Sequence, residues 1–482
     1  MSGLQHRARA RYQDIGLILG PIVFALMLIV PAPAGLTYEA WQVASIVIFM
    51  AIWWATEAIP VPATSLLPLI LLPVLGVSTT KEASNPYTDP IIFLLLGGFI
   101  AAMAMERWNL HRRIALNILK RAGSHPAALI GGFMIASAVL SMWISNTATT
   151  LMMIPIALSV SHTVLGDSAH GHKFTIALLL GIAWSASIGG VGTIIGTPPN
   201  AFVVGFMEQQ TGRTIDFLEW MMLGVPVVIC MVPAAWFVVT KLIFRFDPKE
   251  IQGGDKVIEQ ELKAIKTISK AEIRVAIVFG AMALAWMTRR LVIQVPGFEG
   301  LSNMGIAIIG AVAMFLVPAG NDKRDFLLDW ESAVKLPWGV ILLFGGGLSL
   351  AAAIKKTGLA IWLGEGLSAL SGAPLLLLIF AIVTLVIFLT ELTSNTATTA
   401  ALVPVLAAVA TTGNIDPILL AAPTAMAASC AFMLPVATAP NAVIYSTGNM
   451  TIPQMAKAGL WLNIIGTFII SALCYSLIPI VF

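Results

Sequence analysis

The sequence predicts an all-α polytopic membrane protein built from two matched halves, and three observations support this fold class. Hydrophobic residues make up 58% of the 482 residues and charged residues 11%, and the mean hydropathy of +0.91 is far above that of a soluble chain. Runs without charge, such as 176–201, 220–240 and 460–482, reach the roughly 20 residues that a helix needs to cross a bilayer core. The hexapeptide Ser-Asn-Thr-Ala-Thr-Thr occurs twice, at 145–150 and at 394–399.

The repeat extends beyond the hexapeptide. Pro155 and Pro404 follow the two copies at the same spacing, and Gly-Thr-Pro-Pro-Asn-Ala at 196–201 corresponds to Ala-Thr-Ala-Pro-Asn-Ala at 437–442. Landmarks that match in the same order indicate an internal duplication. In a membrane protein, duplicated segments interrupted by Gly and Pro are typical of transporters whose site lies at the repeat interface.

Charged stretches divide the chain into four parts. Residues 1–13 form a tail whose arginines predict a cytoplasmic N-terminus by the positive-inside rule. Residues 14–244 form the first half, 245–270 a charged cytoplasmic linker, and 271–482 the second half. Matching halves with few charges at the far end favour an inverted repeat whose C-terminus lies outside.

The first half begins with two apolar runs, 15–30 and 43–56, each of which predicts a span. Pro60 and Pro62 follow directly and predict a break in the helix, because proline removes a backbone donor and clashes with the preceding turn. The basic residues between 107 and 121 are expected at the cytoplasmic surface.

Each hexapeptide is flanked by short apolar arms. The arms 127–144 and 151–164 are each short for a full crossing, so we expect a re-entrant hairpin with its tip near 145–147 instead of two spans. The second half repeats this plan with a tip near 394–396.

Interrupted helices are expected after both hairpins. The adjacent prolines near 196–200 cannot continue an α-helix, and the matching segment near 437–441 carries Pro440. Unwound backbone at membrane depth is tolerated only where it is buried or lines a cavity. The two breaks therefore predict a site.

The chemistry of that site follows from its helix ends. Tips and breaks expose unpaired N–H groups and a partial positive charge, which bind anions without a charged side chain. Amides and hydroxyls nearby add donors, and freed carbonyls with Ser, Thr and Asn oxygens suit a cation such as Na⁺. None of these segments carries Arg or Lys, so a bound dianion requires a co-bound cation, which is a physical reason for coupling.

The two Ser-Asn-Thr motifs, the two break motifs, Trp-Trp-Ala-Thr-Glu-Ala-Ile-Pro at 53–60 and Glu-Leu-Thr-Ser-Asn-Thr at 391–396 resemble the divalent anion:sodium symporter family. The resemblance runs from about residue 15 to the end. It implies an inverted-repeat elevator-type transporter: a homodimer in the cell (inner) membrane, with about eleven spans, two re-entrant hairpins and two broken helices. A scaffold part holds the dimer, and a transport part slides.

The resemblance implies that substrate is bound by Ser145, Asn146, Thr147, Thr197, Pro198, Ser394, Asn395, Thr396 and Thr438. The resemblance implies a first sodium site at Ser141, Ser145, Asn146 and Gly196, and a second at Thr390, Thr393, Asn395 and Ala437. Ala439 stands where the first break has Pro198, which loosens one wall of the site.

The function predicted from these features is sodium-coupled uptake of C4-type dicarboxylates of the succinate, malate and fumarate class. The alternatives are a sodium-independent dicarboxylate exchanger and a family member that carries tartrate, citrate or sulfate. An enzyme is not expected, because acid-base or metal-ligating groups are not clustered at depth. No cofactor besides co-transported Na⁺ is predicted, and the net charge of +3 suggests no nucleic-acid partner.

Two carboxylates, Glu57 and Glu391, lie near apolar runs. An ionisable group in a membrane is suspected of function by default. We nevertheless predict structural roles for both, bonded to backbone or to a nearby base, because the sodium-site pattern is complete without them.

Overall fold

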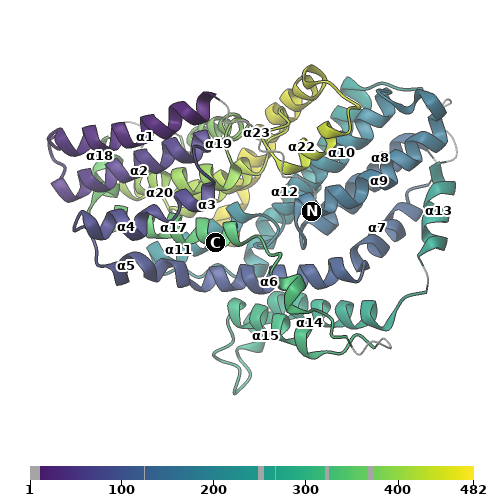
Figure 1. Cartoon of the computed structure of the whole chain (residues 1–482), viewed down its shortest axis with the longest axis horizontal. Coiled ribbons are helices and arrows are strands. Elements are labelled where there is room, and N and C mark those ends of the chain that lie inside the picture. The colour runs from purple at the N-terminus through teal and green to yellow at the C-terminus, as the bar shows by residue number, and fades with distance from the viewer. Residues whose placement is uncertain (1–10, 124, 248–253, 266, 321–324, 367–373) are drawn as a thin grey trace.

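A computed structural model describes residues 11–482 except 124, 248–253, 266, 321–324 and 367–373 (Figure 1). Within these residues the secondary structure is helical, apart from one isolated β-bridge between Pro318 and Phe326. The predicted all-α fold is confirmed. Most of the predicted N-terminal tail and part of the predicted linker, 245–270, lie outside the described residues.

Seven α-helices of the described part precede the first hairpin: α1 (Arg11–Ile29), α2 (Tyr38–Thr56), α3 (Val61–Thr64), α4 (Leu67–Val74), α5 (Thr80–Ser84), α6 (Pro90–Arg107) and α7 (Leu110–Lys120). The break predicted at Pro60 is present. Glu57 ends α2 in a left-handed conformation with φ of 46°, and Pro60 is the residue before α3.

The first hairpin consists of α8 (Pro126–Ser141) and α9 (Asn146–Leu165), and both arms pack against α10 (Lys173–Gly190). Helix α11 (Pro198–Thr211) continues α10 after a non-helical stretch over 191–197. The break therefore lies slightly earlier than the predicted 196–200. Both prolines occupy the first turn of α11, where a missing N–H leaves no intrahelical hydrogen bond unmade.

The second half repeats this arrangement with α19 (Leu375–Thr390), α20 (Asn395–Thr412), α21 (Ile418–Ala428) and α22 (Ala439–Ser446). The second non-helical stretch, 429–438, is the longer of the two. Each broken helix is followed by a long helix, α12 (Phe217–Phe237) in the first half and α23 (Ile452–Val481) in the second, and these two helices pack against each other.

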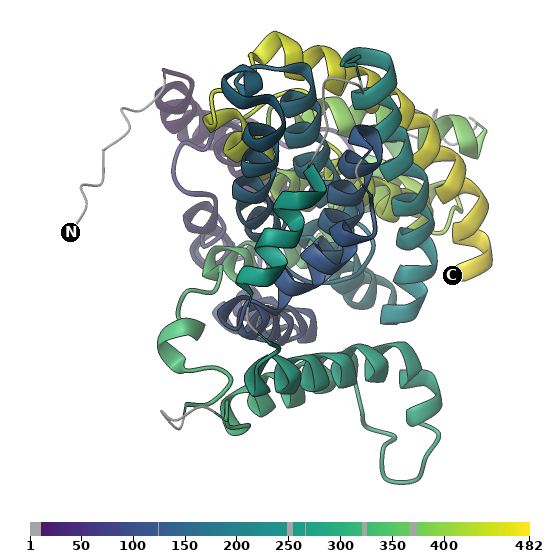
Figure 2. The same ribbon diagram turned by 90° about the vertical axis from the view of Figure 1, so that its right-hand side faces the viewer.

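The helices between α12 and α19 are α13 (Gly254–Ala264), α14 (Lys270–Val292), α15 (Asn303–Leu316), α16 (Trp330–Ala333), α17 (Trp338–Lys356) and α18 (Leu359–Gly366). Helices α14 and α15 form a layer along one edge of the molecule, beside α6 (Figures 1 and 2). The contact is close at Gly97 of α6, where a Cβ atom would lie 2.6 Å from the main-chain carbonyl of Ala307.

Ion pairs mark the two ends of this helical bundle. At the α7 end, formed by α7, α13 and the start of α14, Arg113 pairs with Glu272 at 2.7 Å and Arg112 pairs with Glu261. At the α5 end, formed by α5 and the end of α17, Lys356 pairs with Glu82 at 3.0 Å.

Ten helices in the described part are long and apolar enough to cross a membrane. Two of them, α9 and α20, are hairpin arms. The hairpin arms are not counted as crossings, and the pairs α3–α4, α10–α11 and α21–α22 each count as one interrupted crossing. Together with α1, α2, α6, α12, α14, α15, α17 and α23, the described helices then give about eleven crossings, as the resemblance implies.

Candidate functional site

A cavity of about 740 Å³ lies where the two hairpin tips meet the two helix breaks. Its wall includes every residue that the sequence analysis expected to bind substrate: Ser145, Asn146, Thr147, Thr197, Pro198, Ser394, Asn395, Thr396 and Thr438. These residues come from four segments spread over about 300 positions of the chain. The fold therefore assembles the predicted set into one polar cavity.

Helix N-termini face this cavity because α9, α11 and α20 all begin at its wall. Ser145 and Ser394 precede the first turns of α9 and α20 with nearly the same backbone angles, φ/ψ of −54°/134° and −63°/130°, and neither side chain caps its helix. Thr197, before α11, also makes no side-chain cap. The first N–H groups of α9 and α20 are thus left for a ligand, and a helix N-terminus favours an anion. Helix α11 offers fewer donors, because Pro198 and Pro199 carry no N–H and the N–H of Asn200 bonds to the carbonyl of Thr197 at 3.2 Å.

The fourth helix start differs from the other three. The hydroxyl of Thr438 accepts a hydrogen bond from the backbone N–H of Asn441 at 3.2 Å, which caps α22. This asymmetry was not predicted. It coincides with the position where Ala439 replaces the proline of the first break.

The first cluster of oxygen atoms lies beneath the tip of the first hairpin. Ser141 donates a hydrogen bond to Oδ1 of Asn146. A Cβ atom on Gly190 would lie 2.8 Å from that Oδ1 and 3.0 Å from the carbonyl oxygen of Gly196. Nδ2 of Asn146 lies 3.1 Å from the same position, so a side chain larger than that of glycine would clash there. The two oxygen atoms and the hydroxyl of Ser141 are neutral ligands of the kind that suits a hard cation.

The second cluster repeats this geometry in part. The hydroxyl of Thr390 donates to Oδ1 of Asn395 at 2.7 Å and lies 3.0 Å from the carbonyl oxygen of Ala428. Ala437 lines the adjoining cavity. The hydroxyl of Thr393, by contrast, bonds to Thr398 at 2.6 Å and to the carbonyl of Leu389 at 3.0 Å.

The hydroxyl of Thr393 therefore differs from that of Thr390, because its hydrogen bonds go to Leu389 and Thr398 and not to Asn395.

Two asparagines that the sequence analysis quoted but did not assign shape the breaks. The amide of Asn200 donates to the carbonyls of Gly190, Val191 and Thr193 at 3.0, 3.2 and 2.8 Å. The amide of Asn441 donates to the carbonyls of Ala431 and Leu434, both at 3.1 Å. Their occurrence at the end of both break motifs was the signal that could have identified them.

Glu391 ties the second hairpin to the second break, as its predicted structural role requires. Its carboxylate accepts hydrogen bonds from the backbone N–H groups of Phe432, Met433 and Leu434 at 2.7, 2.9 and 3.1 Å, and from the amide of Asn463 at 2.8 Å. The residue is only 3% exposed. The prediction of a backbone-bonding role for Glu391 is confirmed.

Three charged residues from other parts of the fold also line the cavity: Glu57, Glu106 and Lys335. Sequence reasoning missed Glu106 and Lys335, because they lie at the end of α6 and just before α17, far from any motif. Lys335 is a positive charge at the wall of the cavity, where Glu57 and Glu106 add two carboxylates. No side-chain hydrogen bond or ion pair of Glu57 is present among the described residues, so the backbone bond predicted for it is not found.

Two hairpins and two broken helices, related by an internal repeat and assembled around a polar cavity between long apolar helices, define a multi-pass membrane transporter. Comparisons with known proteins identify the family. Residues 13–481 match the family described as the sodium:sulfate symporter transmembrane region. The chain therefore belongs to this family, and the resemblance to the divalent anion:sodium symporters is confirmed.

Relatives within the family are similar over nearly their whole length. The chain is 44% identical over 476 residues to the "Sodium-dependent dicarboxylate transporter SdcS" of Staphylococcus saprophyticus, which covers 97% of this chain and 92% of that relative. It is 43% identical over 479 residues to the protein of the same name from Staphylococcus aureus strain bovine RF122, with the same coverage. These relatives are transporters, as expected, and the chain is not an enzyme.

Solved structures support the fold. The YdaH transporter of Alcanivorax borkumensis aligns with a TM-score of 0.58 at 15% identity, over 97% of each chain. MtrF of Neisseria gonorrhoeae aligns with a TM-score of 0.59 at 14% identity, over 98% of this chain and 95% of that one. At these identities the likeness concerns the fold alone.

Proposed function

We propose that this protein carries C4-type dicarboxylates into the cell together with Na⁺. The observation that carries the proposal is the cavity in which uncapped helix N-termini lie beside two clusters of neutral oxygen atoms. The name "sodium-dependent dicarboxylate transporter" of full-length relatives supports the same substrate class.

The proposed coupling works through the two asparagines at the tips. Oδ1 of Asn146 belongs to the first cation cluster, and Oδ1 of Asn395 to the second. Both residues also line the cavity proposed for the substrate, and each is the first residue of its helix, α9 or α20. A Na⁺ ion in each cluster would fix the tip and add positive charge beside the dianion, so that each ligand raises the affinity for the other.

We assign the substrate carboxylates to Ser145, Asn146 and Thr147 at one tip and to Ser394, Asn395 and Thr396 at the other. Thr197, Pro198 and Thr438 would form the walls between them. Lys335 and the first-turn N–H groups supply the positive potential that the substrate meets as it enters or leaves.

The proposed motion is that of an elevator. The transport part would comprise α8–α12 and α19–α23, which carry the tips and breaks, and the scaffold part would comprise α1–α7 and α14–α18. The boundary between them runs where α11 and α20 pack against α17, α18 and α2. A homodimer is proposed on the scaffold side, supported by apolar residues that α14 and α15 expose, such as Ile277, Leu284 and Ile309.

The orientation is proposed from charge. Basic residues gather at the α7 end, which carries Arg107, Arg112, Arg113, Lys120 and Arg121, and basic residues favour the cytoplasmic side. In this proposal the N-terminus lies in the cytoplasm and the C-terminus outside, and the membrane is the cell (inner) membrane. The ends of α2 and α6 that bear Glu57 and Glu106 then lie on the cytoplasmic side, so the cavity would open inward.

The test is uptake of radiolabelled succinate by proteoliposomes with an inward gradient of Na⁺, or of K⁺ in its place. Concentrative uptake with Na⁺ alone is expected. Uptake only into vesicles preloaded with dicarboxylate would instead identify an exchanger. Competition by unlabelled malate, fumarate, tartrate, citrate and sulfate ranks the substrates, and strong inhibition by sulfate alone would contradict the dicarboxylate assignment.

A further inference from the structure

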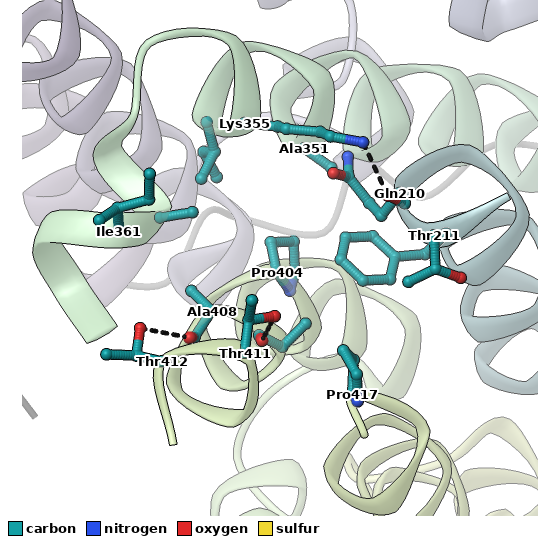
Figure 3. A pocket seen from close by; sticks show the side chains of 14 residues that line it. Gln210, Thr211, Ala351, Lys355, Ile361, Pro404, Ala408, Thr411, Thr412 and Pro417 are labelled. Carbon is teal, nitrogen blue, oxygen red and sulfur yellow. Dashed lines mark hydrogen bonds between the residues drawn. The ribbon is translucent and has the colours of Figure 1, made fainter. Parts of the chain in front are cut away.

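A second cavity, of about 220 Å³, lies at the α5 end between α11 and α20 on one side and α17 and α18 on the other (Figure 3). It shares no lining residue with the polar cavity. Its wall is mainly apolar and includes Phe206, Ala351, Ile354 and Ala407. It is thus a separate site between segments that belong to different parts of the fold.

One wall of this cavity is polar and positively charged. The ammonium group of Lys355 donates a hydrogen bond to the main-chain carbonyl of Gln210 at 2.7 Å. The side-chain nitrogen of Gln210 is buried and has no hydrogen-bond partner among the described residues. Figure 3 shows the Lys355 ammonium and the Gln210 side chain close together on this wall.

These two side chains offer more donors than the protein uses. An ammonium carries three N–H donors and an amide two. The buried nitrogen of Gln210 is unpaired, which is unfavourable, and Lys355 is exposed, so its remaining donors are open to a ligand. Among the described residues Lys355 has no ion pair, whereas its neighbour Lys356 pairs with Glu82 at 3.0 Å. An anionic oxygen at this wall would satisfy both groups.

The rest of the cavity suits a hydrocarbon chain. The volume is below the range of about 300–1,000 Å³ that is usual for pockets of drug-sized ligands, so only a slender group fits. Ile361 of α18 lines the cavity and is 63% exposed, which places the mouth at the apolar surface of a membrane protein. Acyl chains are the groups that meet such a surface.

We propose that this cavity binds one acyl chain of an anionic phospholipid, with the phosphate of its head group held by Lys355 and Gln210. The consequence for transport rests on the proposed elevator motion. Helices α11 and α20 would move, whereas α17 and α18 would not. An acyl chain bound between them would therefore stabilise the conformation described here and slow the transport cycle.

A purely structural role for Lys355 is the competing interpretation. Gln210 lies in the last turn of α11, and a cation at a helix C-terminus is favourable because of the helix dipole. In that case the contact is a latch between α11 and α17, and the identity of the surrounding lipid is irrelevant.

The binding experiment uses the full-length protein in proteoliposomes that contain phosphatidylglycerol with a photoreactive diazirine at the end of one acyl chain. The expected result is crosslinking to peptides of α11, α17 or α20 that line the cavity. Lys355→Gln should reduce it about fivefold, as expected for the loss of one basic residue that attracts an anionic lipid. The matched control Lys356→Gln, next to it but outside the cavity, should leave it unchanged.

Equal crosslinking in Lys355→Gln, or equal crosslinking by a phosphatidylcholine probe of the same chain, would overturn the proposal in favour of the structural latch. The effect on transport is measured as Na⁺-driven succinate uptake in phosphatidylglycerol and in phosphatidylcholine vesicles. Slower uptake in phosphatidylglycerol is expected for the wild type and for Lys356→Gln but not for Lys355→Gln. Equal uptake rates of the wild type in both lipids would contradict the proposed slowing of transport by the bound acyl chain.

The two proposals fail separately. Specific crosslinking together with no succinate uptake in any vesicle would contradict the proposed function and leave the lipid site standing. Normal Na⁺-driven uptake without specific crosslinking would contradict the lipid site and leave the proposed function standing.

Discussion

Asn146 and Asn395 are the residues on which the proposed coupling depends, because each belongs to a proposed cation cluster and lines the cavity proposed for the substrate. Single mutants test this directly. Asn146→Ala and Asn395→Ala remove a cation ligand and a substrate donor together, and hydrogen bonds to charged groups are worth about 1.5–3 kcal/mol each. Each variant should lower succinate uptake by roughly 100-fold or more.

The control for this pair is Asn117→Ala, because Asn117 lies on α7 and bonds only to the carbonyl of Arg113 at 2.8 Å. It should transport like the wild type. Normal uptake by Asn395→Ala would show that the second cluster is not needed.

Ser141 should act on the cation alone. Its hydroxyl is buried against Asn146 and it does not line the substrate cavity. Ser141→Ala should raise the Na⁺ concentration for half-maximal uptake by about tenfold, since one oxygen ligand is lost, while the maximal rate at saturating Na⁺ is kept.

Ser137 is the matched control, one turn earlier on the same helix, equally buried and without a hydrogen-bond partner among the described residues. Ser137→Ala should leave the Na⁺ dependence as it is. The same shift in both variants would assign the effect to helix packing and not to an ion.

The long helix that follows each broken helix, α12 or α23, packs closely against the backbone of the break at a glycine. On α12, a Cβ atom on Gly224 would lie 2.5 Å from the carbonyl oxygen of Val191. On α23, a Cβ atom on Gly459 would lie 2.3 Å from the carbonyl oxygen of Phe432. Both contacts are with backbone, which cannot move aside as a flexible side chain can.

Gly224→Ala and Gly459→Ala should each therefore destabilise the protein by about 1–3 kcal/mol, as overpacking does. Thermal unfolding in detergent measures the effect. Gly280→Ala on α14 is the control, because no atom lies within 4 Å of its added Cβ, and it should be neutral or slightly stabilising. Equal unfolding temperatures of all three variants would show that the glycine contacts with the breaks do not contribute to stability.

Helix α7 contains a buried histidine that gives the fold a pH dependence. His111 is 7% exposed and its Nδ1 lies 3.2 Å from the carbonyl oxygen of Met105. Burial lowers the pKa of His111, only partly offset by this hydrogen bond. The neutral form is therefore the one that packs, and its stabilising contribution is complete above the unfolded pKa of about 6.5.

That contribution is lost as the pH falls from this value through the lowered pKa of the folded protein. The unfolding temperature should drop between pH 7 and pH 5.5, and His111→Gln should reduce the drop. An unchanged pH profile in the variant would mean that other groups cause it.

The hairpins and the broken helices could be predicted from the sequence, because the residues that mark them lie within short stretches of the chain. Prolines mark the breaks and the duplicated hexapeptide marks the tips, although the first break lies at 191–197 because Pro198 begins a helix as readily as it ends one. The capping of α22 by Thr438 could not be foreseen from the motif. It depends on a single hydroxyl rotamer in the second break.

At the scale of the whole molecule, the sequence predicted which segments meet but not what surrounds them. Lys335 and Glu106 line the cavity only because α6 and α17 pack beside the tips and breaks. Such contacts join positions far apart in the chain and carry no motif. The sequence shows that the duplicated segments carry no Arg or Lys, but it could not show that Lys335, just before α17, lines the same cavity.

The central claim is that Na⁺ and a dicarboxylate bind at one assembled site and raise each other's affinity. It is tested most directly by measuring succinate binding to the purified protein at several Na⁺ concentrations, and Na⁺ binding with and without succinate. The account predicts that succinate affinity rises with Na⁺ but not with K⁺, and that succinate raises Na⁺ affinity by the same factor. Succinate affinity that is independent of Na⁺ would contradict it.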